Sequence, residues 1–290
     1  MAEQSKEVAK RKPVDVLKAT MCAPSVQDQF KNALGENSNS FVASVIDLYN
    51  TDTSLQECNP NQVVMEALKA AVLKLPINKA LGYAYILKFK NKGVPTPTFI
   101  IGYKGLIQLA MRTGQYRYIN TDKVYEGEIS GKDKLTGAIY FDGEKKSDKV
   151  IGYFAYIELL NGFQKTIYSD VEDIAKHAKK YSPSLRFDKR TASELTKLAG
   201  CDPTGIGWIG DFDSMALKTV LRELLSKYGY LSIEMQDAIS RDKETDLMSN
   251  RDQAIEEAEA VPVDINDYSF DDNSSSGNQS HDPKIEEPPY

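Results

Sequence analysis

Four cationic side chains at helical spacing are the residues of this sequence best suited to binding chemistry. Lys104 and Arg112 lie eight positions apart in one amphipathic segment, and Lys218 and Arg222 lie four apart in a later one. Because residues four apart share one face of an α-helix, each pair is expected to project from a single polar stripe. Like charges at this spacing repel by about 0.2–0.5 kcal/mol, and an anion lying across both would offset the repulsion.

Aromatic residues crowd the first of these segments. Tyr103 precedes it directly, and Tyr116, Arg117 and Tyr118 follow it. Cations beside aromatic rings suit a sugar-phosphate backbone that carries unpaired bases. Polar stripes on amphipathic helices usually face water, however, so these residues alone leave simple solvent exposure as the alternative interpretation.

Other basic residues are candidates for contact with an anionic strand on the basis of local charge alone. They fall at the end of an alternating strand-like segment, after the first amphipathic segment, and in a basic cluster near residue 188. These residues are Lys88, Arg117, Arg186, Lys189 and Arg190.

Motifs for nucleotide cofactors receive little support. Residues 205–210 match the pattern GxGxxG, but Trp208 lies inside it, and Asp211 and Asp213 follow closely and would repel phosphate. The sequence contains no GxxxxGK[ST] phosphate loop, so nothing in it indicates ATP hydrolysis. We expect the glycines to form an irregular turn that places Trp208 in the core, against a base or against a neighbouring subunit.

A magnesium-dependent nuclease is the enzymatic alternative. Asp133, followed by the Glu-Lys-Lys sequence at residues 144–146, resembles an arrangement in which two carboxylates hold Mg²⁺. These residues fall in charged loops, which poorly suit a metal site of defined geometry. His177 and His281 are the only histidines, which argues against histidine-centred catalysis. We therefore expect a non-enzymatic protein without cofactor or metal; a self-assembling structural protein is a second alternative.

The charge is divided unevenly along the chain. The 290 residues carry a formal net charge of −6, but residues 241–290 hold 14 acidic and 4 basic side chains, a net of −10. Residues 1–240 hold 28 acidic and 32 basic side chains, a net of +4. The acidity therefore belongs to the C-terminal segment, and the part expected to fold is basic enough for an anionic partner.

Cysteine usage and hydropathy bear on the compartment. Cys22, Cys58 and Cys201 are widely spaced and form no CxxC pair, which disfavours a disulfide framework or a zinc site. The first residues are polar and basic without an apolar stretch typical of a signal peptide, and no run of eighteen apolar residues occurs. The expected location is cytoplasmic.

Hydrophobic periodicity predicts an α+β fold with three regions. Residues 1–24 carry several lysines and arginines together with Pro13 and Pro24, and are expected to form a flexible basic arm. Residues 25–240 are expected to form the core, in which helix-like and strand-like segments alternate. Residues 241–290 mix acidic residues with Ser, Asn, Gly and Pro, which predicts a disordered tail with a possible partner-binding role.

Within the core, period-two and period-3.6 segments alternate. Helices are expected at residues 25–34 and 40–49, after the Asn59-Pro60 cap, after Asp170, near Asp213 and at 231–240. Strands are expected from residue 82 to a turn at 91–93, at 99–101, 116–126, 137–142, 150–160 and 163–168, with Asn161-Gly162 forming a hairpin turn.

Three segments together resemble the phage RecT family of single-strand annealing proteins. They are YKGLIQLAMRTGQ at residues 103–115, HAKKYSPS at 177–184 and MALKTVLRELL at 215–225. The resemblance covers roughly residues 25–240 and implies an α+β fold in which a small antiparallel sheet with a projecting β-hairpin packs on helices. It implies an ATP-independent protein that coats single-stranded DNA, pairs it with a complementary strand and promotes recombination as an oligomeric ring or helical filament.

The resemblance also implies site residues and partners. Lys104 and Arg112 from the first motif, and Lys218 and Arg222 from the third, are the positions expected on the DNA backbone. Possible partners are a 5′-to-3′ exonuclease and the host single-strand binding protein, and the acidic tail lies where a partner-binding region would be. A bacteriophage protein acting in the cytoplasm of a bacterial host is the implied setting.

Overall fold

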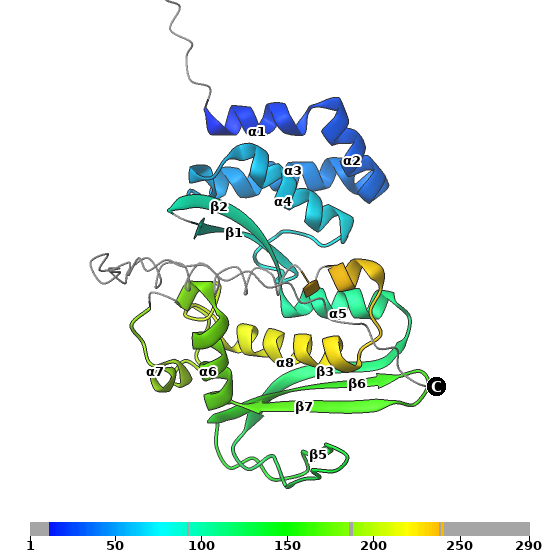
Figure 1. The fold of residues 1–290 in the computed structure, drawn as a ribbon, viewed down its shortest axis with the longest axis vertical. Helices are drawn as coiled ribbons and strands as arrows, with labels where there is room; N and C mark the ends of the chain where they lie inside the picture. Colours follow the sequence, from blue (N-terminus) through cyan, green and yellow to red (C-terminus); the bar gives the residue numbers. More distant parts are fainter. Residues whose placement is uncertain (1–11, 92, 186–187, 238, 241–290) are drawn as a thin grey trace, which may run out of the picture. The chain divides into compact units, whose positions relative to one another are not determined.

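A computed structural model describes residues 12–91, 93–185, 188–237 and 239–240. It confirms the expected mixture of helices with small antiparallel sheets (Figure 1). The expected acidic tail at residues 241–290 and the basic residues of the arm before Lys12 lie outside the described residues.

The N-terminal part is a bundle of four helices with its own apolar core. The helices are α1 (Pro13–Met21), α2 (Pro24–Leu34), α3 (Ser38–Thr51) and α4 (Pro60–Val72), with short 3₁₀ turns at Gly35–Asn37 and Leu55–Glu57. Proline opens α1, α2 and α4, where its missing N–H costs nothing and its fixed φ suits a helix. The Asn59 side chain accepts a hydrogen bond from the Asn61 N–H at 2.9 Å, which confirms the predicted cap of α4.

Helix α1 differs from the flexible arm expected through residue 24. Leu17 and Met21 are completely buried in the same apolar cluster as Phe30 and Tyr49. Pro13 and Pro24 do prevent one continuous helix, but each begins a helix of its own. Burial of the two apolar side chains then fixes α1 against the bundle.

Two strands form a hairpin that belongs to both halves of the core. Strands β1 (Ala84–Asn91) and β2 (Val94–Ile101) pair antiparallel, with Ala84 opposite Ile101 and Asn91 opposite Val94. Ile86 packs into the helical bundle, whereas Ala84 and Ile101 pack into the second core. The hairpin thereby joins the two clusters (Figure 1).

The second core lies between helices and a three-stranded antiparallel sheet in the order β3-β6-β7. The strands are β3 (Tyr116–Tyr125), β6 (Val150–Leu159) and β7 (Gln164–Asp170), and Tyr153 at the centre pairs with Lys123 and Ser169. Asn161 and Gly162 turn the chain between β6 and β7, and Gly162 has a φ of +86°, as predicted for this hairpin. Only Ile139–Tyr140 (β5) of the strand expected at 137–142 is formed, paired with Gly131–Lys132 (β4).

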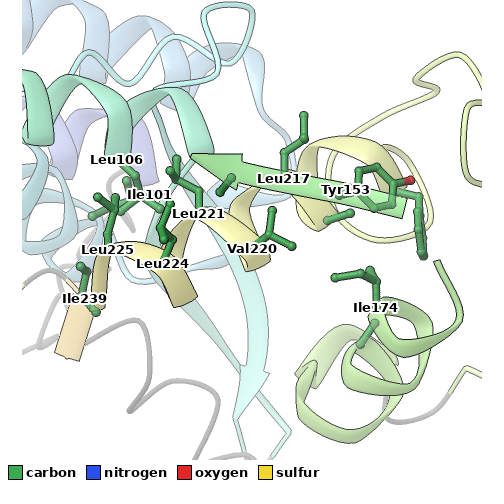
Figure 2. Packing of buried hydrophobic residues seen from close by; sticks show 14 of the residues in the cluster. Ile101, Leu106, Tyr153, Ile174, Leu217, Val220, Leu221, Leu224, Leu225 and Ile239 are labelled. Carbon is green, nitrogen blue, oxygen red and sulfur yellow. The ribbon is translucent and has the colours of Figure 1, made fainter. Parts of the chain in front are cut away.

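Helices cover one face of this sheet. They are α5 (Tyr103–Arg112), α6 (Val171–Tyr181), the short α7 (Ala192–Thr196) and α8 (Phe212–Tyr228), with a 3₁₀ turn at Pro183–Leu185. Residues 233–237 and 239–240 are also helical. Figure 2 shows Leu221, Leu224 and Leu225 of α8 close to Ile101 and Leu106, which flank the start of α5. The apolar face of α8 therefore fixes α5 and the base of the hairpin together.

Candidate nucleic-acid interface

A cavity of about 560 Å³ opens between the β1–β2 hairpin, the start of α5, the end of α6, the loop at residues 205–211 and α8. We call it the trough and define it by the cationic and aromatic side chains that line it. The cations are Lys79, Lys88, Lys218 and Arg222, and the aromatic residues are Tyr85, Phe89, Tyr103, Tyr181 and Trp208. Asp52 and Asp211 also line it, so its surface is not purely cationic.

Lys79 and Lys88 are both paired with carboxylates. The Lys79 ammonium lies 2.5 Å from an oxygen of Asp52, and the Lys88 ammonium lies 2.9 Å from an oxygen of Glu57. Glu57 is 57% exposed in its side chain, so solvent screens the second pair strongly. Ion pairs of this kind hold the cations at the trough and can be exchanged for pairs with phosphate.

Lys218 and Arg222 lie one turn apart on α8. Lys218 is only 8% exposed, although it faces the trough, and Arg222 is partly exposed. A rise of 1.5 Å per residue separates their Cα atoms by about 6 Å along the helix axis. The two therefore present a pair of positive charges in a row along one wall.

The aromatic side chains give the opposite walls a neutral character. Burial, followed by the nearby charge of Asp211, raises the pKa of Tyr85 and of Tyr103 above the ordinary value of 10.0, so both phenols are uncharged at neutral pH. The Tyr181 ring packs against the His177 ring at an interplanar angle of 46°, with 4.7 Å between ring centroids. Neutral rings beside ammonium and guanidinium groups are the combination on which unpaired bases stack while their phosphates are neutralised.

A close backbone approach positions Tyr103 at the trough. Gly105, inside α5, lies so near the chain before β1 that a Cβ atom there would come within 2.2 Å of the Tyr83 carbonyl oxygen. Only glycine fits at position 105, which explains why a residue that usually weakens helices occurs inside α5. Gly102 is equally constrained, since its Cβ would lie 2.1 Å from the Gly82 carbonyl oxygen. Gly105 thus allows α5 to pack directly against the start of the hairpin.

Two aspartates fix the beginning of α8. The Asp211 side chain caps the helix by accepting a hydrogen bond from the Ser214 N–H at 2.9 Å. Asp213 accepts hydrogen bonds from the Tyr153 hydroxyl at 2.6 Å and the Gly200 N–H at 2.9 Å, and pairs with Lys123 at 3.1 Å. The direction of α8, and hence of Lys218 and Arg222, is tied to the central strand of the sheet.

The structure divides the sequence-predicted site residues into three groups. Lys88, Tyr103, Lys218 and Arg222 line the trough. Lys104 is exposed on α5, and Lys189 is exposed beyond α6. Arg117 pairs with Glu158 at 2.9 Å on the sheet, and Arg190 pairs with Asp188 at 2.7 Å. Arg186 lies outside the described residues.

Arg112 has a different environment from Lys218 and Arg222. Its guanidinium donates hydrogen bonds to the backbone carbonyl oxygens of Leu73 at 2.6 Å and Lys74 at 3.0 Å. These carbonyls follow the end of α4, where a cation satisfies unpaired acceptors and the helix dipole. Arg112 also borders a second, smaller cavity of about 210 Å³, so the two predicted pairs do not meet in one trough.

Several trough residues were missed by sequence reasoning. Tyr85 and Phe89 fall on one face of the alternating β1 segment, a signal that could have grouped them with Tyr103. His177 and Tyr181 are four apart in α6, but the sequence does not reveal that α6 ends beside α8. Lys79 lies in an irregular segment that offers no periodic signal.

The glycine-rich loop places Trp208 in the core, which decides between the three expected environments. Trp208 is 4% exposed and packs edge-on against Phe212, with ring centroids 5.4 Å apart. Asp133, from the alternative nuclease motif, accepts hydrogen bonds from the Leu135 N–H and the Thr136 hydroxyl in a turn. Among the described residues, no three His, Cys, Asp or Glu side chains gather as metal ligands would.

No helix in the described part of the chain combines the length and apolar character needed to cross a lipid bilayer.

Comparison with known proteins identifies the family of this chain. The family model described as "RecT family" matches residues 39–261. The "Uncharacterized protein YqaK" of Bacillus subtilis (strain 168) is 42% identical over 244 residues, which cover 84% of this chain and 78% of the relative. "Protein RecT" of Escherichia coli (strain K12) is 28% identical over 232 residues, which cover 76% of this chain and 74% of the relative. The chain therefore belongs to the RecT family of single-strand annealing proteins, whose role lies in DNA recombination.

Proposed function

We propose that the protein holds single-stranded DNA in the trough and pairs it with a complementary strand without nucleotide hydrolysis. The observation that carries this proposal is the gathering of Lys79, Lys88, Lys218 and Arg222 with five aromatic side chains in one cavity. Such a surface tracks a sugar-phosphate backbone and stacks bases with little regard to sequence. Family membership supports the annealing role itself.

Within the trough, we assign the phosphates to the α8 wall. Lys218 and Arg222 lie about 6 Å apart along the helix axis, so their head groups can contact neighbouring phosphates of one strand. Tyr85 and Tyr103 supply uncharged rings for the bases. Lys104, Lys189 and Arg190 remain proposed contacts outside the trough, where a strand leaving it would pass.

Annealing needs no chemical fuel. Base stacking contributes about 1.4 kcal/mol per step, so duplex formation runs downhill once two strands meet. The obstacle is repulsion between two polyanions, which cationic side chains relieve. A row of protomers in a ring or helical filament would align many troughs, so that one long strand is neutralised while its bases are tested against a second strand.

The proposed setting is a bacterial cytoplasm during phage recombination. A 5′-to-3′ exonuclease would expose the strands, and the host single-strand binding protein would cover them. Residues 241–290, with a net charge of −10, are the proposed partner-binding segment. Deleting residues 245–290 is then expected to preserve annealing of naked oligonucleotides and to weaken annealing of strands covered by the host protein.

The central experiment mixes complementary oligonucleotides with protein in the absence of any nucleotide. Accelerated duplex formation is expected from the wild type, with a lower rate for Arg222→Gln and Lys88→Gln. Each lost phosphate contact should also flatten the slope of log affinity against log salt by about 0.7 for single strands.

Lys134→Ala is the matched control, because Lys134 is an exposed lysine that does not line the trough. Failure of the wild type to accelerate duplex formation would reject the proposed function. An unchanged salt slope in Arg222→Gln, with its thermal unfolding unchanged, would remove that residue from the phosphate contacts. Shortening of labelled DNA in the presence of Mg²⁺ would instead favour the nuclease alternative.

A further inference from the structure

The loop at residues 205–210 presents two exposed aliphatic side chains to the trough, which the apolar residues Leu87, Ile100, Ile101 and Met215 also line. Ile206 is 40% exposed and Ile209 is 36% exposed, and both line the cavity. Trp208, between them in sequence, is only 4% exposed and packs in the core, although it also borders the cavity. The two isoleucines are therefore not part of the packing that fixes the loop.

The loop that carries them is held tightly by its own backbone. The carbonyl oxygen of Gly210 accepts a hydrogen bond from the Thr204 N–H at 2.7 Å, and the carbonyl oxygen of Gly207 accepts one from the Asp211 N–H at 2.7 Å. A Cβ atom on Gly210 would lie 2.6 Å from the Gly205 carbonyl carbon, so the two arms of the loop touch. Gly207 has a φ of +86°, which disfavours other residues.

Two anchors connect this loop to α8. Trp208 packs on Phe212, the first residue of α8, and Asp211 caps that helix. Met215, Lys218 and Arg222 follow along the same helix and line the same cavity. The distance between the isoleucines and the two cations is therefore fixed by the helix and does not depend on a flexible linker.

We propose that Ile206 and Ile209 form an apolar wedge that inserts against the bases of the strand held in the trough and opens a base step. Apolar side chains in other nucleic-acid binders separate stacked bases in this way, at a cost of a few kcal/mol that surrounding contacts offset. The inference rests on the proposed function, since the occupant is the strand whose phosphates lie on α8. It adds that the bound strand is unstacked at a defined place.

Nucleobases fit this surface better than the apolar side chains of a protein. The isoleucines lie in the same cavity as Lys79, Lys88, Lys218 and Arg222, so an occupant that carries negative charge next to flat apolar groups matches this surface. A single strand combines both features. Opening one base step would divide the bound strand into short blocks with exposed base edges. A second strand could then be tested for complementarity to each block, and the bound strand would be kept from folding on itself.

The test uses single-stranded oligonucleotides that carry 2-aminopurine, whose fluorescence is quenched by stacking on neighbouring bases. Binding of the wild-type protein is expected to raise the fluorescence, because an aliphatic side chain separates bases without quenching. The double variant Ile206→Ser/Ile209→Ser is expected to lose most of this rise while its salt slope stays equal to that of the wild type. Ile233→Ser is the matched control, since Ile233 is 81% exposed and does not line the trough.

The outcomes separate the wedge from the proposed function. A wild type that binds the oligonucleotide without any rise in fluorescence, or a double variant that keeps the full rise, overturns the wedge and leaves the annealing function intact. A wild type that does not bind single strands overturns both.

Should the double variant lose its thermal unfolding transition, the single variants Ile206→Ala and Ile209→Ala replace it. Each single variant is expected to lose part of the rise in fluorescence. A change in oligomer size with unchanged fluorescence would assign the isoleucines to a contact between subunits and overturn the wedge.

Discussion

The Tyr153 hydroxyl donates a hydrogen bond of 2.6 Å to the Asp213 carboxylate, which joins the centre of the sheet to the first turn of the helix that bears Lys218 and Arg222. Tyr153 is completely buried, and burial followed by the charge of Asp213 raises the pKa of its hydroxyl far above 10.0. The phenol is therefore protonated at neutral pH and can act as the hydrogen-bond donor. The same carboxylate also holds Gly200 and Lys123.

Replacement of this tyrosine tests whether the connection stabilises the fold. Tyr153→Phe removes the donor and leaves the ring, so we expect the free energy of unfolding to fall by about 1.5–3 kcal/mol, as for hydrogen bonds to charged groups. Urea unfolding followed by circular dichroism measures the change. Tyr118→Phe is the control, because Tyr118 is 61% exposed and a surface change is expected to stay within about 0.5 kcal/mol. Equal stability of the two variants would contradict the proposed role of the Tyr153 hydrogen bond.

Arg112 offers a test that separates a structural role from DNA contact. Arg112→Ala removes two hydrogen bonds to the carbonyls of Leu73 and Lys74. We expect a loss of roughly 1 kcal/mol in the free energy of unfolding and no change in the salt dependence of single-strand binding. Arg112→Lys keeps the charge but loses the forked geometry, so its stability should resemble that of the alanine variant. A salt slope flattened by alanine but not by lysine would place Arg112 on the DNA backbone.

Most elements of the fold could be predicted because each depends on a local pattern. The Asn59-Pro60 cap, the turn at Asn161-Gly162 and the alternation of β1 each follow from the physical chemistry of a few neighbouring residues. The flexible-arm expectation misses α1 because its nine residues make only about two and a half turns, too short for a clear helical pattern. Burial of Leu17 and Met21 against partners more than nine residues away cannot be read from a short segment.

The candidate site was predictable only in part. Helical spacing paired Lys218 with Arg222, and both line the trough. The same spacing paired Lys104 with Arg112, but periodicity cannot show that the end of α4 reaches Arg112 and takes up its guanidinium. The trough is lined by residues that lie far apart in sequence, so Lys79, Tyr85 and His177 come together only through tertiary packing.

Helix α1 provides a third prediction, which concerns the N-terminal bundle. Leu17→Ala is expected to lower the free energy of unfolding by about 2–5 kcal/mol, because Leu17 is completely buried and its loss leaves a cavity among the helices. Lys18→Ala, one position further along the same helix, alters an exposed side chain and should change stability by less than about 0.5 kcal/mol. Urea unfolding of both variants measures the two changes in the free energy of unfolding. A mild effect of Leu17→Ala would mean that α1 contributes little to the stability of the bundle.

The last prediction concerns pH and rests on His177, which lines the trough beside Tyr181. Burial, followed by the positive charges of Arg222 and Lys180, lowers the pKa of His177 below 6.5, while Glu223 opposes the shift. The folded protein thus binds fewer protons at this position than the unfolded chain. The free energy of unfolding is therefore expected to fall as the pH drops below about 6.5 and to be unaffected by this residue above it.

Bound DNA is expected to shift the pKa of His177 in the opposite direction. A phosphate near Arg222 and His177 would offset the positive charge that disfavours protonation, so the bound state takes up a proton that the free protein lacks. Affinity for single strands is expected to rise between pH 7.5 and 6, by at most tenfold per pH unit for one proton. His177→Gln should remove this dependence, while His281→Gln, the control at the only other histidine, should keep it. An equal pH dependence in both variants would show that no phosphate lies near His177, and would move the strand away from this end of the trough.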